Sequence, residues 1–223
     1  MDKASEKNMA NGNLPYGVPH QEVADKLLSY FEPNYVGTMV EIGAAHPESI
    51  STSFPLRKLG WQIISIEPIP EFCEEFKKRG FPVLQYACYS RDQGRMTFKI
   101  SPGRVNSSSL GVRHHDIIKA AFNWTDADFE TIEVEALTLG TILSKHHPTL
   151  TAFDILSVDT EGWELEVMQG LDLKRFAPKV VCLESIPTPE NQGSWERLKE
   201  HMESNQYEWN QQYGVDNFFV PRK

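Results

Sequence analysis

The stretch Gly37-Thr-Met-Val-Glu-Ile-Gly43 decides the fold, because it joins a short apolar run to a glycine. Such a run is typical of a buried strand, and the glycine permits a tight turn after it. A second run of this kind, Trp61-Gln-Ile-Ile-Ser-Ile-Glu67, follows a predicted helix over residues 49–59 and ends at Pro68. Strand, helix and strand in this order predict parallel strands.

The same alternation continues along the chain. Further helices are predicted over residues 20–31, 71–79, 137–147, 161–171 and 193–205, and further strands over 83–88, 96–100, 131–136, 153–159 and 179–184. The last two predicted strands, 207–212 and 218–220, are joined by a short turn and predict a hairpin. The sequence therefore predicts an α/β, Rossmann-like fold, with a mostly parallel sheet, an antiparallel C-terminal edge strand and helices on both faces.

The length of 223 residues fits one such domain. Residues 1–18 are rich in Asn, Gly and Lys and predict a flexible tail, which leaves residues 19–223 as the domain. Residues 101–128 are irregular and long for a loop in a compact domain. A loop of this length favours a lid or an acceptor site.

Composition excludes several classes of partner. The net charge of -9 and the lack of a basic patch disfavour nucleic acid. No apolar run approaches the roughly 20 residues that span a bilayer, and the N-terminus lacks the apolar block of a signal peptide. Three widely spaced cysteines, Cys73, Cys88 and Cys182, fit reduced thiols. We expect a cytoplasmic protein that acts on a small-molecule or glycan acceptor; its oligomeric state stays open.

The loop after the first strand, Gly43-Ala-Ala-His-Pro-Glu48, indicates the kind of cofactor. It lacks the G-x-G-x-x-G pattern that cradles a pyrophosphate. Pro47 removes a backbone donor and Glu48 adds negative charge, so both oppose a phosphate. S-adenosylmethionine, which carries a positive sulfonium and no phosphate, is favoured over NAD. Glu67, at the end of the second strand, has a carboxylate that can accept both hydroxyls of a ribose.

Asp159-Thr-Glu-Gly162 follows the apolar run 153–158 and should lie at the mouth of the sheet. Two interpretations stay open for each acid. Asp159 is either functional or an N-cap, and Glu161 is either functional or a compensating charge at a helix N-terminus.

These segments resemble the FkbM family of methyltransferases. The resemblance rests on Val40-Glu-Ile-Gly-Ala-Ala45, on Ile66-Glu-Pro68, and on a D-x-E-G block formed by Asp159, Glu161, Gly162, Glu164 and Gly170. It covers about residues 37–220. It implies use of S-adenosylmethionine and methylation of a hydroxyl oxygen on a sugar, a glycan or a natural product.

The resemblance also implies a set of cofactor-binding residues: Glu41, Gly43, Ala44, Ala45, His46, Glu67, Pro68, Ala87, Cys88 and Asp159. The family's first loop often reads G-A-N-x-G, whereas this chain has Ala45, His46 and Pro47. His46 therefore either contacts the methionine end of the cofactor or caps the loop.

A neutral hydroxyl needs a general base, for which the candidates are Asp159, Glu161 and His115. Acceptor-binding candidates are Asn106, Ser108, Ser109, His114 and Glu184. Asp159, Glu161 and Glu184 could together hold a divalent metal, but carboxylates alone are a weak signal, and none is predicted. An NAD-dependent oxidoreductase of Rossmann type and a non-catalytic binding module of the same fold stay open as alternatives.

Overall fold

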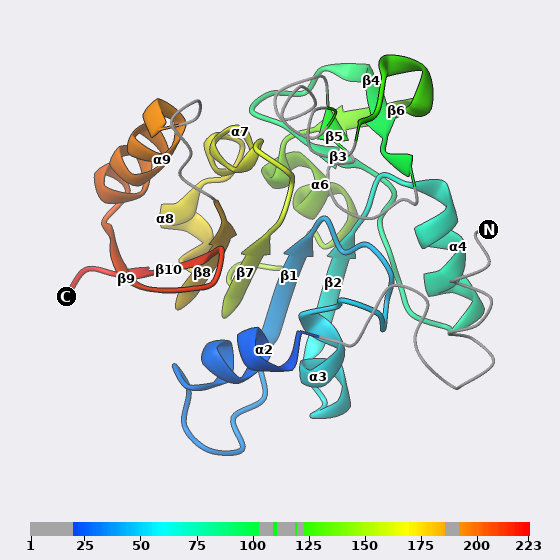
Figure 1. Cartoon of the computed structure of the whole chain (residues 1–223). Helices are drawn as coiled ribbons and strands as arrows, with labels where there is room; N and C mark the ends of the chain where they lie inside the picture. Colours follow the sequence, from blue (N-terminus) through cyan, green and yellow to red (C-terminus); the bar gives the residue numbers. More distant parts are fainter. Residues whose placement is uncertain (1–19, 103–108, 111–118, 120–122, 186–191) are drawn as a thin grey trace.

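A computed structural model of the chain describes residues 20–102, 109–110, 119, 123–185 and 192–223. Within these residues the main sheet has the strand order β2-β1-β7-β8-β10-β9 (Figure 1). The strands are β1 Thr38–Ile42, β2 Gln62–Ile66, β7 Ile155–Val158, β8 Val180–Glu184, β9 Tyr207–Tyr213 and β10 Asp216–Pro221. The predicted α/β fold is confirmed.

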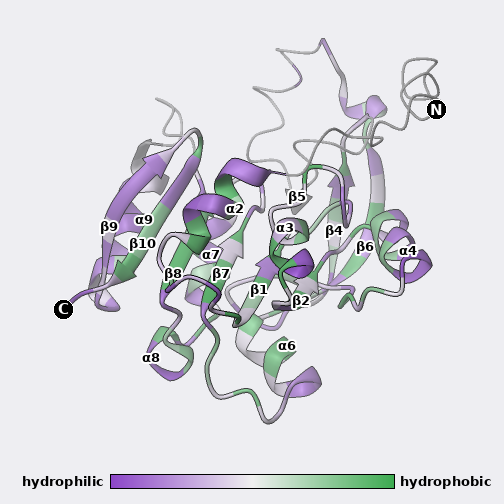
Figure 2. Cartoon of the chain, turned by 90° about the horizontal axis from the view of Figure 1, so that it is seen from below, coloured by the Kyte–Doolittle hydropathy of each residue, from purple (hydrophilic) through white to green (hydrophobic). Residues whose placement is uncertain are grey.

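The four strands β2, β1, β7 and β8 are parallel, and β10 runs antiparallel to both of its neighbours. The hairpin of β9 and β10 lies at one side of the sheet as predicted, but β10 itself lies one place in from the edge. Phe218 and Phe219 of β10 are both fully buried, because they point to opposite faces that helices cover. The polar strand β9 takes the edge, and its hydrophilic colour contrasts with β10 in Figure 2.

Helices cover both faces of the main sheet because successive strand residues are apolar and point to opposite sides. On one face, Met39, Ile63 and Ile155 pack with α2 (Gln21–Leu28) and α3 (Ser53–Lys58). On the other, Val40 and Leu156 pack with the remaining helices of this layer, which are α6 Leu139–His146, α7 Glu164–Gln169, α8 Leu173–Phe176 and α9 Gln192–Ser204.

A second, smaller sheet has the order β3-β6-β4-β5. Its strands are β3 Ala87–Cys88, β4 Gly94–Ile100, β5 Ser109–Leu110 and β6 Glu130–Leu137, and a 3-10 helix, η2 Asp126–Asp128, precedes β6. Helix α4 (Pro70–Lys78) packs on this sheet through Phe72, which shares a core cluster with Phe98 and Ile100. Figure 1 shows this sheet above the carboxyl ends of β1 and β2.

The strand predicted over residues 83–88 is wrong in extent, and most of its pairing lies outside the main sheet. Leu84 makes a single parallel bridge to Ile66 of the main sheet, and Ala87 and Cys88 then pair with β6 of the second sheet. The chain thus crosses between two sheets within a few residues. Periodicity within one short apolar run carries no information about which strand it will pair with.

Local features of the helices follow from their residue types. Gly80 follows α4 in the left-handed conformation, with φ 70°, as expected of a glycine that ends a helix. Pro55 lies in the first turn of α3, where its missing N–H costs no helical hydrogen bond. Among the described helices, none is long and apolar enough to cross a membrane.

Candidate functional site

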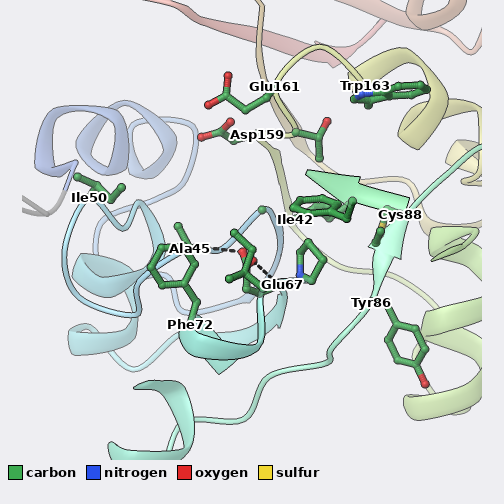
Figure 3. A pocket seen from close by; sticks show the side chains of 16 residues that line it. Ile42, Ala45, Ile50, Glu67, Phe72, Tyr86, Cys88, Asp159, Glu161 and Trp163 are labelled. Atoms are coloured by element: carbon green, nitrogen blue, oxygen red, sulfur yellow. Dashed lines mark hydrogen bonds between the residues drawn. The ribbon is translucent and has the colours of Figure 1, made fainter. Parts of the chain in front are cut away.

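The site lies where the chain leaves two neighbouring strands in opposite directions. After β1 it turns to α3 on one face of the sheet, and after β7 it turns to α7 on the other. Such a switch leaves a crevice at the carboxyl ends of the strands. A cavity opens there (Figure 3), lined by Ile42, Gly43, Ala45, Ile50, Glu67, Pro68, Ile69, Phe72, Tyr86, Ala87, Cys88, Phe98, Asp159, Thr160, Glu161 and Trp163.

Gly43 brings the backbones of β1 and β7 together at this point. It has φ 74°, a conformation that disfavours side chains, and its amide donates to the carbonyl oxygen of Ile66. A Cβ atom at position 43 would collide with the carbonyl oxygen of Asp159. The glycine therefore sets how closely the two strand ends approach, and it keeps the floor of the cavity free of side chain.

Glu67 lies at the bottom of the cavity and is 3% exposed. Its Oε2 accepts a hydrogen bond from the Ala45 amide at 2.8 Å, and its Oε1 accepts one from the Ile69 amide at 2.7 Å (Figure 3). Burial raises the pKa of this carboxyl to about 7, although the two amides act in the opposite direction. Each oxygen keeps a second lone pair for a ligand.

Glu164 holds the turn that carries Asp159 and Glu161. Its buried Oε1 accepts from the Thr160 amide, the Thr160 hydroxyl and the Gly162 amide, each at 3.1 Å. Burial raises the pKa of Glu164 to about 7. The second glutamate of the D-x-E-G-x-E block thus shapes the turn.

Three non-glycine residues of the cavity wall have left-handed backbone conformations: Ala45 with φ 47°, Ile50 with φ 51° and Glu161 with φ 54°. Such conformations are unfavourable for side chains and persist where the surrounding structure holds them. Their concentration around one cavity makes it the candidate functional site.

The carboxylates at the mouth of the cavity influence one another. The Asp159 side chain is open to the cavity, yet desolvation by the surrounding protein raises the pKa of its carboxyl well above the ordinary value. Glu184 and Glu161 add to this rise because their negative charges oppose a third. Asp216, on β10 beyond Glu184, has its pKa raised to about 6 by burial and by Glu184. This edge of the sheet favours positive charge.

Eight of the predicted site residues line the cavity together: Gly43, Ala45, Glu67, Pro68, Ala87, Cys88, Asp159 and Glu161. Glu184, at the end of β8, lies outside the wall and acts on it through its charge. Ala44 is buried and donates its amide to the Ile66 carbonyl oxygen, so it supports the loop from behind.

Glu41 lies away from the cavity, contrary to expectation. Its buried carboxylate accepts from the Ser53 amide at 3.1 Å and from the Ser53 hydroxyl at 2.6 Å, and so fixes the start of α3. The alternation along β1 explains this, since Ile42 and Glu41 point to opposite faces. His46 also lies outside the wall, and its Nδ1 accepts from the amides of Glu48 and Ser49 within the loop.

The other predicted acceptor-site residues, Asn106, Ser108, His114 and His115, lie outside the described residues. Ser109 is described in its backbone, as the first residue of β5. Among the described residues no group of three or more His, Cys, Asp and Glu side chains could hold a metal ion.

The sequence did not identify the apolar part of the wall, which consists of Ile42, Ile50, Ile69, Phe72, Tyr86, Phe98 and Trp163. Apolar residues in a sequence carry no signal that separates a cavity wall from the core. Phe98 comes from the second sheet, so its place depends on pairing between distant strands.

Comparisons with known proteins found a matching family and similar solved structures. The methyltransferase FkbM domain matches residues 41–210. The chain is similar to the structure of precorrin-6y C5,15-methyltransferase from Geobacter metallireducens GS-15, with 12% identity, 95% of this chain and 93% of that chain covered, and a TM-score of 0.45. It is also similar to a proposed caffeoyl-CoA O-methyltransferase from Staphylococcus aureus, with 9% identity, 98% and 90% covered, and a TM-score of 0.48.

Both TM-scores lie below 0.5, so neither structure bears on the activity of this chain. No curated protein sequence matches it. The domain match covers most of the chain and includes the first glycine loop, Glu67 and the D-x-E-G block. The chain therefore belongs to the FkbM family of methyltransferases.

Proposed function

We propose that this methyltransferase binds S-adenosylmethionine in the cavity between β1, β2 and β7 and methylates a hydroxyl oxygen of a sugar, a glycan or a natural product. The observation that carries the proposal is that Gly43, Glu67 and Asp159 meet around one cavity. Within the described residues, the charged side chains of its wall are all acidic.

The wall fits the parts of S-adenosylmethionine. The carboxylate of Glu67 is suited to the two hydroxyls of a ribose, because it can accept both protons. Ile69 and Phe72 offer an apolar surface to an adenine ring. Asp159 and Glu161 favour the positive sulfonium and ammonium groups through charge.

The same wall opposes NAD. A pyrophosphate needs cations or free helix amides near it. Here the Ala45 amide already donates to Glu67, and three carboxylates, those of Glu67, Asp159 and Glu161, face the cavity. Bringing two phosphates into this space would add negative charge to negative charge.

When bound, S-adenosylmethionine supplies an electrophilic methyl group. Asp159 is suited to accept the proton of an acceptor hydroxyl, because a carboxylate with a raised pKa is a better base near neutral pH. Glu161 and Glu184 place negative charge beside Asp159, and this charge would repel an anionic acceptor. A neutral polyol meets no such barrier, and this supports a sugar or natural-product hydroxyl as the acceptor.

Calorimetry with S-adenosylmethionine and NAD tests the cofactor. We expect the first to bind and the second not to bind. The variant Glu67→Gln should lose most of the affinity, whereas Glu74→Gln, an exposed glutamate on α4, should bind like the wild type. Binding of NAD in place of S-adenosylmethionine would overturn the proposal.

A transfer assay with methyl-labelled S-adenosylmethionine tests the acceptor. Neutral sugars and polyols, their phosphorylated forms, and primary amines serve as three acceptor groups. We expect label in the neutral hydroxyl compounds, with an O-methyl signal in the product's NMR spectrum. Labelled amines with unlabelled alcohols would refute oxygen as the acceptor atom and leave the cofactor assignment intact.

A further inference from the structure

The loop after Gly43 forms one wall of the cavity in a strained shape. Ala45 and Ile50 both line the cavity, and both have positive φ angles, 47° and 51°. For a β-branched residue such as Ile50 this conformation is a clear outlier. Something in the surroundings must hold the Ala45–Ile50 segment in this shape.

His46 lies inside this segment and is 1% exposed. Its Nδ1 accepts a hydrogen bond from the Ser49 amide at 2.9 Å and from the Glu48 amide at 3.3 Å. An imidazole nitrogen that accepts N–H bonds carries no proton, so a neutral His46 ring has its proton on Nε2. The ring thus closes the loop on itself through two backbone amides.

Helix α4 fixes the closed loop from the side. His46 Nε2 lies 3.9 Å from Glu75 Oε2, and Arg79 Nε lies 3.0 Å from Glu48 Oε2. Arg79 also binds Glu75 at 2.6 Å, which joins the contacts into one network. The same helix carries Phe72, so the network connects two parts of the cavity wall.

We propose that His46 is a positioning residue for cofactor binding: its neutral imidazole holds the Ala45–Ile50 segment as a wall of the cavity, and protonation of the ring releases that wall. A protonated ring has two donors and no acceptor, so the amides of Glu48 and Ser49 lose their partner. His46 does not touch the cavity, and its effect is transmitted through Ala45 and Ile50.

The surroundings keep the ring neutral at ordinary pH. Burial lowers the pKa of His46 below its ordinary value of 6.5, and the positive charge of Arg79 lowers it further. Glu75 and Glu48 act in the opposite direction, but less strongly. Release of the wall is therefore expected in acid, below about pH 6.5.

Two substitutions separate the role of His46 as a hydrogen-bond acceptor from the effect of its protonation. In His46→Asn the side-chain oxygen can occupy the place of Nδ1 and accept the same amides, as in an Asx turn, but it does not titrate. In His46→Ala the acceptor is lost. His147, at the end of α6 and outside the cavity wall, also has a pKa lowered by burial, so His147→Asn is the matched control.

The inference rests on the proposed function, since the ligand is S-adenosylhomocysteine, the product of that cofactor. Near pH 8, His46→Ala should bind it about tenfold more weakly, whereas His46→Asn should stay within about threefold of the wild type. Between about pH 8 and pH 5, the affinity of the wild type should fall relative to that of His46→Asn, because the asparagine does not titrate. His147→Asn should follow the wild type.

A ligand-free measurement keeps the two proposals distinguishable. Hydrogen exchange of the Glu48 and Ser49 amides should be faster in His46→Ala than in the wild type. In acid, it should also become faster in the wild type than in His46→Asn. Nitrogen-15 NMR should show an unprotonated Nδ1 at His46. If the wild type binds no S-adenosylhomocysteine while exchange behaves as expected, the cofactor assignment fails and the loop mechanism stands. Unchanged exchange and unchanged affinity in His46→Ala would overturn the inference alone.

Discussion

The carbonyl oxygen of Asp159 occupies the space that a side chain at Gly43 would need. The two residues end neighbouring parallel strands, and the amide of Asp159 donates to the carbonyl oxygen of Ile42. The close approach of the two strand ends therefore requires a residue without a side chain at position 43.

Gly43→Ala should destabilise the protein strongly. An alanine there would have an unfavourable left-handed conformation, and its Cβ atom would collide with the backbone of Asp159. We therefore expect a loss of more than roughly 2 kcal/mol in unfolding free energy. Gly80→Ala is the matched control, because Gly80 has φ 70° with open space around it. Denaturant unfolding of both variants measures the difference. Equal losses would mean that the clash with Asp159 is relieved at no energetic cost.

Glu164→Gln should separate the shape of the turn from its charge. Glutamine keeps an oxygen for Thr160 and Gly162 but does not titrate. Since the pKa of Glu164 is raised from 4.5 to about 7, its protonated form is favoured by folding. The contribution of this protonated side chain to the free energy of unfolding is present below pH 4.5 and is lost as the pH rises through 7.

The stability of the wild type relative to Glu164→Gln should thus fall by roughly 2–3 kcal/mol between about pH 4.5 and pH 7.5. Urea unfolding across this range gives the value. A difference that grows with pH would show that the carboxylate is the form favoured by the turn. Glu164→Ala should lower stability at every pH, because the turn loses its acceptor.

Asp159→Asn should reduce turnover by about 10²–10⁴, the usual contribution of a general base. The affinity for S-adenosylmethionine should fall much less, because Glu161 still offers a negative charge to the sulfonium. The raised pKa of Asp159 predicts that the wild-type rate rises with pH as this carboxyl ionises. Steady-state rates and calorimetry provide the two numbers. Asp25→Asn, on the exposed side of α2, is the control. A variant as fast as the wild type would remove Asp159 from the mechanism.

Gly170→Ala should disturb the packing between the end of α7 and the chain that follows β3. A Cβ there would collide with the carbonyl oxygen of Tyr89, and Gly170 itself accepts from the Gly140 amide. We expect a loss of about 1–3 kcal/mol in unfolding free energy. Gly193→Ala, with open space around it, should be close to neutral. Thermal unfolding of the two variants measures this difference directly.

Features that depend on local periodicity were predictable from the sequence. The strand ends carrying Gly43, Glu67 and Asp159 follow clear apolar runs, and parallel strands bring such ends to one edge. Glu41 was assigned to the cavity because it belongs to the same motif as Gly43. The two-residue period of a strand separates it from Ile42, and that rule would have placed it correctly.

Features that depend on distant pairing were not predictable. Ala87 and Cys88 join the second sheet because β6 offers them a parallel partner, and nothing in residues 83–88 identifies that partner. Phe98 reaches the cavity through the antiparallel pairing of β4 with β6. Single-sequence patterns describe an element and its faces, whereas these contacts arise from the choice between alternative neighbours.

The cavity is bounded by two sheets whose described strands form separate hydrogen-bonded ladders. Gly43, Glu67 and Asp159 come from the main sheet, whereas Cys88 and Phe98 come from the smaller one. A molecule that fills this space touches both and acts as a non-covalent cross-link between them. Its binding energy is then added to the cohesion of the protein, so saturation with ligand should protect the smaller sheet against proteolysis more than it protects the larger one.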